Sequence, residues 1–308
     1  CTSGMAAIGL CLELFEEGSH ILCTEDLYGG TVRMFESIGE KRGVTFSYID
    51  TSDIELVRKS IRKETKALYI ETPSNPTMKV TDFAAMREIA DEYGLLIIAD
   101  NTFLTPYFQK PLTLGADLVV HSGTKFLGGH NDVLAGFVCI KGKGLSEKLR
   151  YTYKTVGCCL PPFDSFLVLR GIKTLSVRLE RQQENAKKIA LWLKDRPEVK
   201  AVYYTGLPEH PGYEINQKQA SGCGSMISFK VDSEKRARKL LESVKLISYA
   251  ESLGGVESLI TYPMLQTHGD VPVETRERLG ITEDFLRMSV GIENAEDLIA
   301  DLEQALAE

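Results

Sequence analysis

Basic residues are not in excess in this sequence, and long hydrophobic runs are missing. The 36 Lys and Arg are outnumbered by 43 Asp and Glu, which gives the 308 residues a formal net charge of -7. Nucleic acids are bound through basic surfaces, so this charge balance argues against them. The longest apolar runs, such as Leu95–Ala99, fall far short of the roughly 20 residues that cross a bilayer. We therefore expect neither nucleic acid nor a membrane as a partner.

Patterns for metal binding and disulfide formation are missing as well. The seven cysteines include no Cys-x-x-Cys pair, and their odd number argues against a disulfide framework. The five histidines show no spacing typical of metal ligands, so we expect no metal site. The sequence also has no internal repeat. Free cysteines are typical of a reducing compartment, and we expect a cytoplasmic protein.

The first half of the sequence alternates helix-like stretches with short apolar runs. The expected helices are Met5–Glu17, Gly30–Arg42, Asp53–Glu64 and Phe83–Tyr93. The expected strands are Ser19–Thr24, Val44–Ile49, Lys66–Glu71, Leu95–Asp100, Ala116–His121 and Gly136–Ile140. This alternation predicts an α/β fold with a mainly parallel sheet that is covered on both faces. In such sheets, ligands bind at the carboxyl ends of the strands.

The pattern changes after Pro161-Pro162, where we place a domain boundary between residues 1–162 and 163–308. A single long amphipathic helix is predicted over Phe163–Lys194. The elements predicted after it are strands Val199–Tyr204 and Ser225–Val231, helix Ser233–Val244, strands Leu246–Ala250 and Phe285–Val290, and helix Ala295–Leu306. This order indicates a smaller α+β domain.

Lys125 is the first candidate for chemistry. It follows the apolar run Ala116–Val120 and is preceded by two hydroxyl residues, Ser122 and Thr124. A lysine at the carboxyl end of a strand, with hydroxyl groups beside it, suits a Schiff base next to a phosphate site. Most lysines are solvated surface groups, so this pattern alone is weak.

Asp100 ends an almost wholly apolar strand, one strand before Lys125. A carboxylate that leaves a buried strand at the ligand-binding edge needs a cationic partner, such as a protonated pyridine nitrogen. By itself Asp100 fits a helix or turn cap equally well. Its position relative to Lys125 favours the functional interpretation.

Four further features are ambiguous when taken singly. Ser3–Met5 begins a helix with small residues and leaves main-chain N–H groups for an anion, although small residues pack well in any helix. Tyr28 stands beside two glycines, and Glu71–Pro76 is a Pro-containing turn after a strand. Arg287 interrupts an apolar strand and could grip a carboxylate, although structural ion pairs are the commoner use of arginine.

Together these residues resemble a known set in order and spacing, from Ser3 to the C-terminus. The sequence is similar to the Cys/Met-metabolism family of pyridoxal 5'-phosphate (PLP) enzymes, the transsulfuration enzymes. The resemblance implies PLP as cofactor and a type I, aminotransferase-like large domain with a mostly parallel seven-stranded sheet, followed by the smaller domain. The catalytic residues that it implies are Lys125, Tyr28 and Asp100.

The resemblance also implies a role for each binding residue. Lys125 would carry the cofactor as a Schiff base, Asp100 would pair with its ring nitrogen, and Tyr28 would stack on its ring. The residues implied to hold the cofactor phosphate are Gly4, Met5, Ser122 and Thr124. The residues implied to hold the carboxylate of an amino-acid substrate are Asn75, Ser252 and Arg287.

Family members are usually homotetramers built from dimers that share active sites, so the resemblance implies a homo-oligomer. In the family, a Tyr-x-Arg pair on an N-terminal arm reaches the phosphate of the neighbouring subunit. This sequence begins after the place where that arm would end, and we expect the arm to be missing from the sequence in hand.

The reaction itself stays open. Gly30 stands where methionine γ-lyase has a cysteine, which argues against that activity. Glu251 resembles the acidic residue of γ-synthases and γ-lyases that faces the distal end of the substrate, although an exposed acidic residue at a strand end is its ordinary interpretation. The stretch Thr261–His268 is similar to bacterial enzymes of methionine synthesis.

We therefore expect a cystathionine γ-synthase, which joins an O-acylhomoserine to cysteine. Cystathionine β- or γ-lyase, which breaks a C–S bond of cystathionine, is a close alternative. Another type I PLP activity, such as an aminotransferase, and a non-catalytic α/β binding protein are the remaining alternatives.

Overall fold

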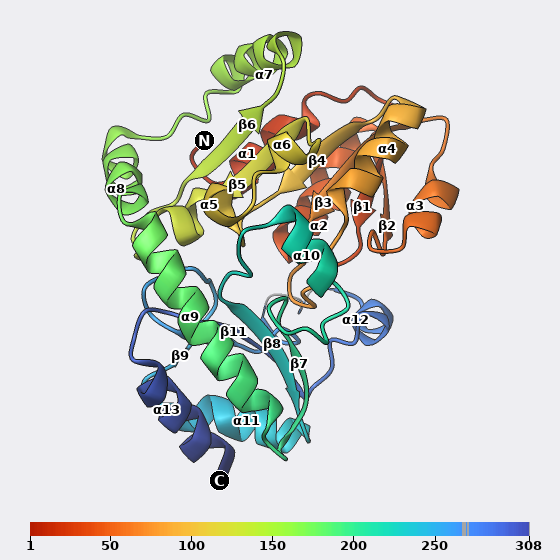
Figure 1. The fold of residues 1–308 in the computed structure, drawn as a ribbon. Coiled ribbons are helices and arrows are strands. Elements are labelled where there is room, and N and C mark those ends of the chain that lie inside the picture. Colours follow the sequence, from red (N-terminus) through yellow and green to blue (C-terminus); the bar gives the residue numbers. More distant parts are fainter. Residues whose placement is uncertain (267–268, 270, 308) are drawn as a thin grey trace.

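The computed structural model describes residues 1–266, 269 and 271–307, and its first half is built on one six-stranded sheet (Figure 1). The strands are β1 (His20–Thr24), β2 (Thr45–Ile49), β3 (Thr65–Glu71), β4 (Leu96–Asp100), β5 (Leu118–Ser122) and β6 (Gly136–Ile140). Their order is β2-β1-β3-β4-β5-β6. Strands β1 to β5 are parallel, and β6 is antiparallel to β5. The mainly parallel α/β sheet predicted from the sequence is confirmed.

The number of strands differs from the seven that the resemblance implied. After β6 the chain forms only helices until Val199, and the later strands of the described residues all belong to a second sheet. The six apolar runs identified in the first half therefore account for all six strands of this sheet.

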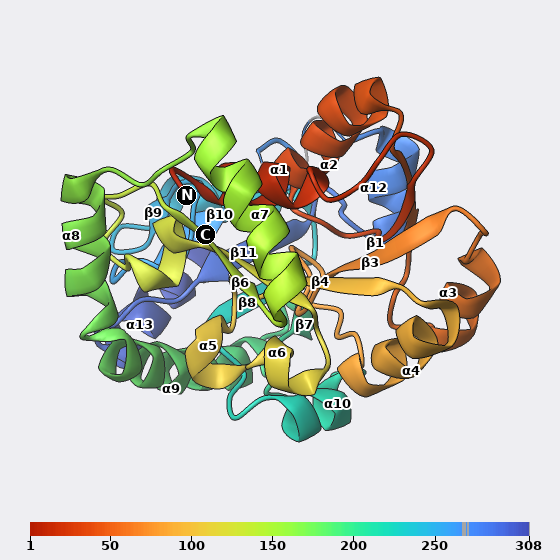
Figure 2. The ribbon, with the colours of Figure 1, turned by 90° about the horizontal axis from the view of Figure 1, so that it is seen from above.

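Helices cover both faces of the six-stranded sheet, as seen from above in Figure 2. The helical segments of this half are α1 (Gly4–Leu12), α2 (Gly29–Met34), η1 (Phe35–Gly39), η2 (Glu40–Arg42), α3 (Ile54–Ser60), α4 (Phe83–Tyr93), α5 (Thr105–Phe108), α6 (Pro111–Leu114), η3 (Gly123–Leu127) and α7 (Lys143–Val156). Helices α1 and α7 share a core with Ile98, whereas α3 and α4 share the opposite core with Ile97. Adjacent residues of β4 thus face opposite cores, which is why this strand is apolar along its length.

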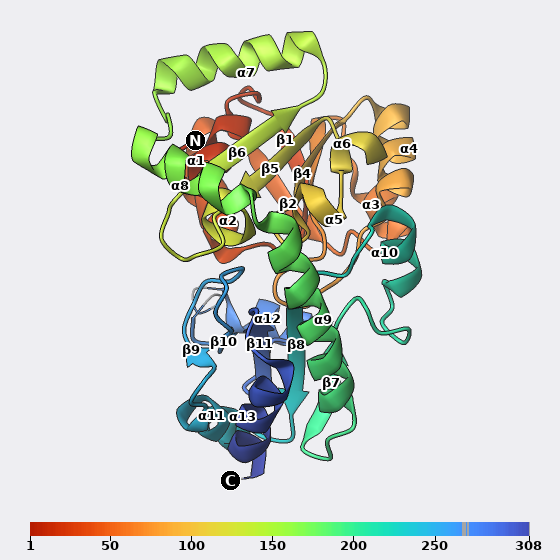
Figure 3. The ribbon, with the colours of Figure 1, turned by 60° about the vertical axis from the view of Figure 1, so that its left-hand side comes forward.

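The second half forms a mixed five-stranded sheet with its own core. Its elements are α8 (Pro162–Ile172), α9 (Leu175–Lys194), β7 (Val199–Tyr203), α10 (Tyr213–Gln219), β8 (Met226–Val231), α11 (Glu234–Ser243), β9 (Ser248–Tyr249), β10 (Leu259–Thr261), α12 (Val273–Leu279), β11 (Phe285–Ser289) and α13 (Ala295–Ala307). The strand order is β7-β8-β11-β10-β9. Helix α9 runs along this sheet beside α13 (Figure 3), and Ile189, Leu240 and Leu298 pack with Ile227 in the core.

The single helix predicted over Phe163–Lys194 is wrong, because the chain breaks between α8 and α9. Gly171 packs against the main chain of residues 127–128, where a Cβ atom would overlap the carbonyl oxygen of Gly128. The carbonyl oxygen of Gly171 accepts hydrogen bonds from the side chains of Thr174 (3.1 Å) and Arg178 (2.9 Å). The N–H of Thr174 also donates to this oxygen at 3.1 Å, three residues on rather than four, so the regular helical pattern ends here and the helix axis changes direction.

The domain boundary at 162/163 falls at the start of α8 and stays a prediction. Within the described part of the chain, no helix is both long and apolar enough to span a membrane. Thr267 and His268, the last two residues of the stretch Thr261–His268, lie outside the described residues.

Candidate functional site

The carboxyl ends of the central strands carry the polar side chains of the candidate site. Glu71 ends β3, Asp100 ends β4, and the two residues are direct register partners. Ser122 ends β5, two strands from Glu71. A cavity of about 200 Å³ opens at this edge. Its lining residues include Gly4, Met5, Tyr28, Glu71, Asn75, Asp100, Ser122, Thr124 and Lys125.

Lys125 lies in η3, the short helical turn that follows β5. Its Nζ donates a hydrogen bond to Ser252 Oγ at 2.9 Å, from the first half of the chain to the second. Burial, with a further contribution from the positive charge of Arg287, lowers the pKa of Lys125 to about 8, and Glu251 opposes the shift. Lys125 is therefore neutral in a much larger fraction of molecules at pH 7 to 8 than a surface lysine is.

The start of α1 forms one wall of the cavity. Ser3 caps the helix, because its side chain accepts a hydrogen bond from the N–H of Ala6 at 3.0 Å. A Cβ atom on Gly4 would lie 2.9 Å from Ser122 Cβ, so only glycine allows the main chain to approach this closely. The first N–H groups of a helix have no partner within it, and they favour an anion. Together with the Ser122 and Thr124 hydroxyls, this cradle fits a phosphate group.

Asp100 is held by Thr102, a residue that the sequence did not single out. Asp100 Oδ1 accepts hydrogen bonds from the N–H (3.0 Å) and the hydroxyl (2.6 Å) of Thr102. Thr102 Oγ1 in turn accepts the N–H of Ser122 at 2.9 Å. Burial raises the pKa of Asp100, and the two hydrogen bonds from Thr102 oppose that shift. A cationic nitrogen in the cavity would favour the charged form of this carboxylate.

Tyr28 forms the opposite wall and precedes α2. Its side chain is 42% exposed, and its N–H donates to Glu71 Oε2 at 3.1 Å. A Cβ atom at Gly30 would overlap the Tyr28 ring and would lie 3.1 Å from Met5 Sδ. Gly30 thus leaves the space that the ring occupies.

Arg287 brings together the residues expected to hold a carboxylate. Its NH1 donates to Asn75 Oδ1 at 2.8 Å, and its NH2 donates to Ser252 O at 2.9 Å and to Thr261 Oγ1 at 3.1 Å. Arg287 Nε is buried without a hydrogen-bond partner among the described residues. Burial lowers the pKa of Arg287 to about 10, so the side chain is still charged at neutral pH. A substrate carboxylate is a chemically suitable partner for such a group.

Ser252 itself has a left-handed backbone, with φ at 85°. Such a conformation is uncommon for a residue other than glycine, and it persists where contacts on both sides fix it. Here Arg287 binds its carbonyl oxygen and Lys125 binds its hydroxyl. Ser252 thus connects Lys125 with Arg287.

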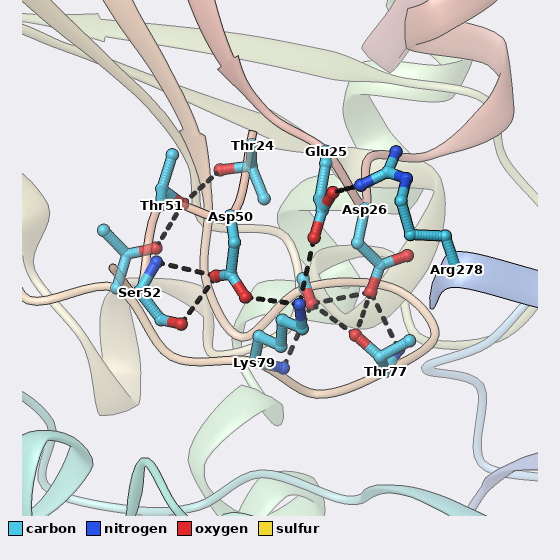
Figure 4. A network of polar contacts seen from close by, with 11 residues as sticks. Thr24, Glu25, Asp26, Asp50, Thr51, Ser52, Thr77, Lys79 and Arg278 are labelled. Atoms are coloured by element: carbon cyan, nitrogen blue, oxygen red, sulfur yellow. Dashed lines mark hydrogen bonds and ion pairs between the residues drawn. The ribbon is translucent and has the colours of Figure 1, made fainter. Parts of the chain in front are cut away.

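The loop that carries Asn75 is held by Asp26 (Figure 4). Asp26 Oδ2 accepts hydrogen bonds from Ser74 Oγ (2.8 Å), from the N–H of Thr77 (2.9 Å) and from the Thr77 hydroxyl. Beside it, Lys79 contacts Glu25 and Asp50, and Arg278 of α12 pairs with Glu25. This network joins α12 of the second half to the first sheet and holds Ser74 and Thr77, which lie on either side of Asn75.

Glu251 is not part of the small cavity. It lines an adjoining open cleft of about 1270 Å³, together with Tyr28, Gly30 and Arg278. Its charge is felt by both Lys125 and Arg287. Tyr28 lines both spaces.

Comparison with known proteins gives the family. A profile for the Cys/Met metabolism PLP-dependent enzymes matches residues 1–307. The cystathionine gamma-lyase of Bacillus subtilis (strain 168) is 50% identical over 305 residues, which are 99% of this chain and 80% of that protein. The cystathionine beta-lyase of Coxiella burnetii is 47% identical over 99% of this chain and 79% of that protein.

Two further matches point the same way. A cystathionine gamma-synthase/O-acetylhomoserine (thiol)-lyase of Bacillus subtilis is 47% identical over 100% of this chain and 78% of its own length. The crystal structure of cystathionine gamma-lyase from Lactobacillus plantarum, complexed with L-serine, matches with a TM-score of 0.97 and 44% identity. The match covers 99% of this chain and 80% of that chain.

The chain belongs to the Cys/Met-metabolism family of PLP-dependent enzymes. It is thus an enzyme with PLP as its cofactor, and the alternative of a non-catalytic binding protein is set aside.

The structure gathers the predicted residues into three groups. Around the cavity lie Gly4, Met5, Tyr28, Asn75, Asp100, Ser122, Thr124 and Lys125. Ser252 and Arg287 are joined to them by hydrogen bonds, and Glu251 lies in the adjoining cleft. The residues that sequence reasoning missed are Asp26, Glu71, Thr102 and Thr261. Thr102 had a usable signal, because a threonine two positions after an aspartate is a common turn pattern.

Proposed function

We propose that this enzyme is a cystathionine lyase, which breaks a C–S bond of a sulfur-containing amino acid. The observation that carries the proposal is the link from Lys125 through Ser252 to Arg287 and Asn75. It connects an amine of lowered pKa, through the single residue Ser252, with an arginine whose charge suits a carboxylate. The names of similar proteins favour elimination: cystathionine gamma-lyase and beta-lyase are prominent among them.

The residues present fit PLP. In our proposal Lys125 binds its aldehyde carbon, and Asp100 holds a proton on its ring nitrogen. Tyr28 stacks on its ring, and Gly4, Met5, Ser122 and Thr124 bind its phosphate. When bound, the cofactor supplies a conjugated ring that takes up the electron pair released at the substrate Cα.

The chain's own side chains then bind the substrate and move its protons. Arg287, Asn75 and Ser252 orient the substrate carboxylate. The Lys125 amine takes the proton from the substrate Cα and returns it to the substrate side chain. The lowered pKa of Lys125 suits this transfer. Tyr28 gives a proton to the departing sulfur, and Glu251 receives the distal amino group of the substrate.

Cystathionine γ-synthase is the second candidate, and it is the activity that the sequence favoured first. The same residues would bind cystathionine as its product, and Glu251 would bind the amino group of the incoming cysteine. One relative with this name is 47% identical to the chain.

Product analysis separates the candidates. Purified enzyme is incubated with cystathionine, and in parallel with O-acetylhomoserine plus cysteine. A β-lyase releases pyruvate and homocysteine from cystathionine, a γ-lyase releases 2-oxobutyrate and cysteine, and a γ-synthase forms cystathionine from the second mixture. Formation of pyridoxamine phosphate during turnover would instead identify an aminotransferase. Cystathionine left intact while the second mixture reacts would overturn the lyase proposal in favour of the synthase.

We also propose that the enzyme forms a homo-oligomer, a tetramer built from dimers. Helix α8 presents Phe163, Phe166 and Leu169 with 69%, 59% and 64% of their surfaces exposed. A contiguous exposed apolar surface of this kind is typical of a protein interface. Light scattering on Phe166→Glu should give a smaller particle than the unmodified enzyme.

A cytoplasmic location completes the proposal. All seven cysteines are free thiols in the structure, including Cys11 and Cys23 in the core. Free thiols in this number are typical of reducing compartments. Fractionation of cells that express the enzyme tests this point.

A further inference from the structure

Glu71 is a buried carboxyl group that lines the cavity. It is 6% exposed, and it is the register partner of Asp100 at the carboxyl ends of β3 and β4. The sequence offered only a turn at this place. In the structure Glu71 forms two hydrogen bonds. Its side chain accepts the N–H of Tyr28 at 3.1 Å, and its own N–H donates to Thr24 Oγ1 at 3.3 Å.

Glu71 has no cation in direct contact that would balance a negative charge. It forms no ion pair with the residues that the structure describes. The charged groups that face it are Asp100 on β4, Asp26 after β1 and Arg287 on β11. The NH1 and NH2 groups of Arg287 are already bound to Asn75, Ser252 and Thr261. A buried carboxylate without a bound cation is costly, and more so beside a second carboxylate.

The hydrogen bonds decide which of the two neighbouring carboxyl groups carries the proton. Asp100 receives two hydrogen bonds from Thr102, and both stabilise its charged form. Glu71 receives one, from the main chain of Tyr28. Ionisation of both groups at adjacent strand ends is unfavourable, so the proton belongs on the group with fewer donors.

We propose that Glu71 is a positioning residue which, in its un-ionised form, fixes the main chain of Tyr28 beside the cofactor and leaves Asp100 as the charged carboxylate of the pair. The part concerning Tyr28 rests on the proposed function, in which Tyr28 transfers a proton. The charge assignment, with Glu71 un-ionised and Asp100 charged, does not depend on that function.

Burial, and then the charge of Asp100, raises the pKa of Glu71 well above its ordinary range, which agrees with the geometry. The Tyr28 hydrogen bond and Arg287 act in the opposite direction. Glu71 thus stays protonated at pH values where a surface glutamate is ionised.

Infrared difference spectroscopy tests the charge directly. Spectra of the cofactor-loaded enzyme and of Glu71→Gln are compared at pH 8. We expect the unmodified enzyme to show the C=O stretching band of an un-ionised carboxylic acid that Glu71→Gln lacks. A carboxylate band in its place would overturn the charge assignment, and this readout needs no substrate.

Kinetics test the positioning. Glu71→Gln keeps an uncharged hydrogen-bond acceptor, and we expect its kcat to stay within about threefold of the unmodified enzyme. Glu71→Ala removes the acceptor and should lower kcat by about ten- to a hundredfold while the cofactor still binds. An alanine variant as active as the unmodified enzyme, or a glutamine variant as impaired as alanine, would overturn this part.

Asp301→Asn is a matched control for a purely structural effect. Asp301 is also buried (7% exposed) and accepts the N–H groups of Lys245, Leu246 and Ile247, far from the cavity. We expect this variant to alter thermal stability and to leave kcat unchanged. An unmodified enzyme that is inactive on cystathionine and on the synthase mixture would count against the proposed function, and the infrared result would still stand.

Discussion

Lys125 Nζ lies 2.9 Å from Ser252 Oγ, although 127 positions separate the two residues. The contact joins η3, the helical turn that follows β5 of the first sheet, to a loop of the second half. Gly254, two residues further on, packs against Phe126, where a Cβ atom would lie 2.6 Å from its nitrogen, and its φ of 77° also favours glycine. The two halves of the chain therefore meet around the lysine, and the site depends on both.

Lys125→Ala should fold but fail to hold the cofactor covalently. The variant has no amine at the centre of the cavity, so the absorbance band of lysine-bound PLP should disappear and activity should be lost. The control is Lys66→Ala on β3, because Lys66 is exposed and should leave the band intact. A band of full intensity in Lys125→Ala would show that another residue binds the cofactor.

Much of the first sheet was predictable because its strands are short, apolar and separated by helices. Helix α4 has the predicted bounds Phe83–Tyr93, since Asp82 caps its first turn and Gly94, with φ at 67°, ends it. Helix α7 was not predicted, because Leu149 is its one buried residue and its pattern is mostly polar. The short strand β10 was also missed, as its three residues are too few for a periodic signal.

The sequence alone indicated a site residue only where that residue stands at the end of a predicted strand. Lys125 and Asp100 stand at the ends of apolar strands, so both could be predicted to lie at the carboxyl edge of the sheet. Thr261 and Asp26 act through partners that are distant in sequence, and no local pattern indicates such contacts. For Ser252 and Asn75 the resemblance to a family supplied the expectation.

Cofactor uptake should depend on pH through Lys125. Only the neutral amine attacks an aldehyde, and burial lowers the pKa of Lys125 to about 8. The rate of PLP binding to cofactor-free enzyme should thus be low below this pH, where the amine is charged, and should rise through roughly pH 7 to 9. Rapid-mixing absorbance measures this rate.

Arg287 supplies the variant for the same experiment. Its positive charge helps to lower the pKa of Lys125, so Arg287→Met should move the midpoint to higher pH, whereas Arg287→Lys should keep it nearly unchanged. A midpoint near 10 in the unmodified enzyme would contradict the lowered pKa.

Gly30→Ala should displace the Tyr28 ring. The added methyl group overlaps the ring and also approaches Met5 Sδ, so Tyr28 must move away from the cavity. We expect kcat/KM to fall about tenfold or more, a loss of about 1.4 kcal/mol in transition-state stabilisation. Gly144→Ala is the control, because no atom lies within 4 Å of the added group. Equal activity of the two variants would show that the ring position does not matter.

Asp26→Ala should weaken substrate binding more than it slows the chemical step. The variant leaves the hydroxyl of Ser74 and the N–H of Thr77 without their acceptor, at a cost of about 1–3 kcal/mol for each buried group. The loop then loses its fixed position, and Asn75 should move away from Arg287, which in the proposed function orients the substrate carboxylate. KM should rise about tenfold while kcat falls less. Asp50→Ala, which removes a partly exposed ion pair with Lys79 and two hydrogen bonds from Ser52, should change KM little. A kcat effect larger than the KM effect in Asp26→Ala would mean that this loop acts on the reacting bond rather than on the carboxylate.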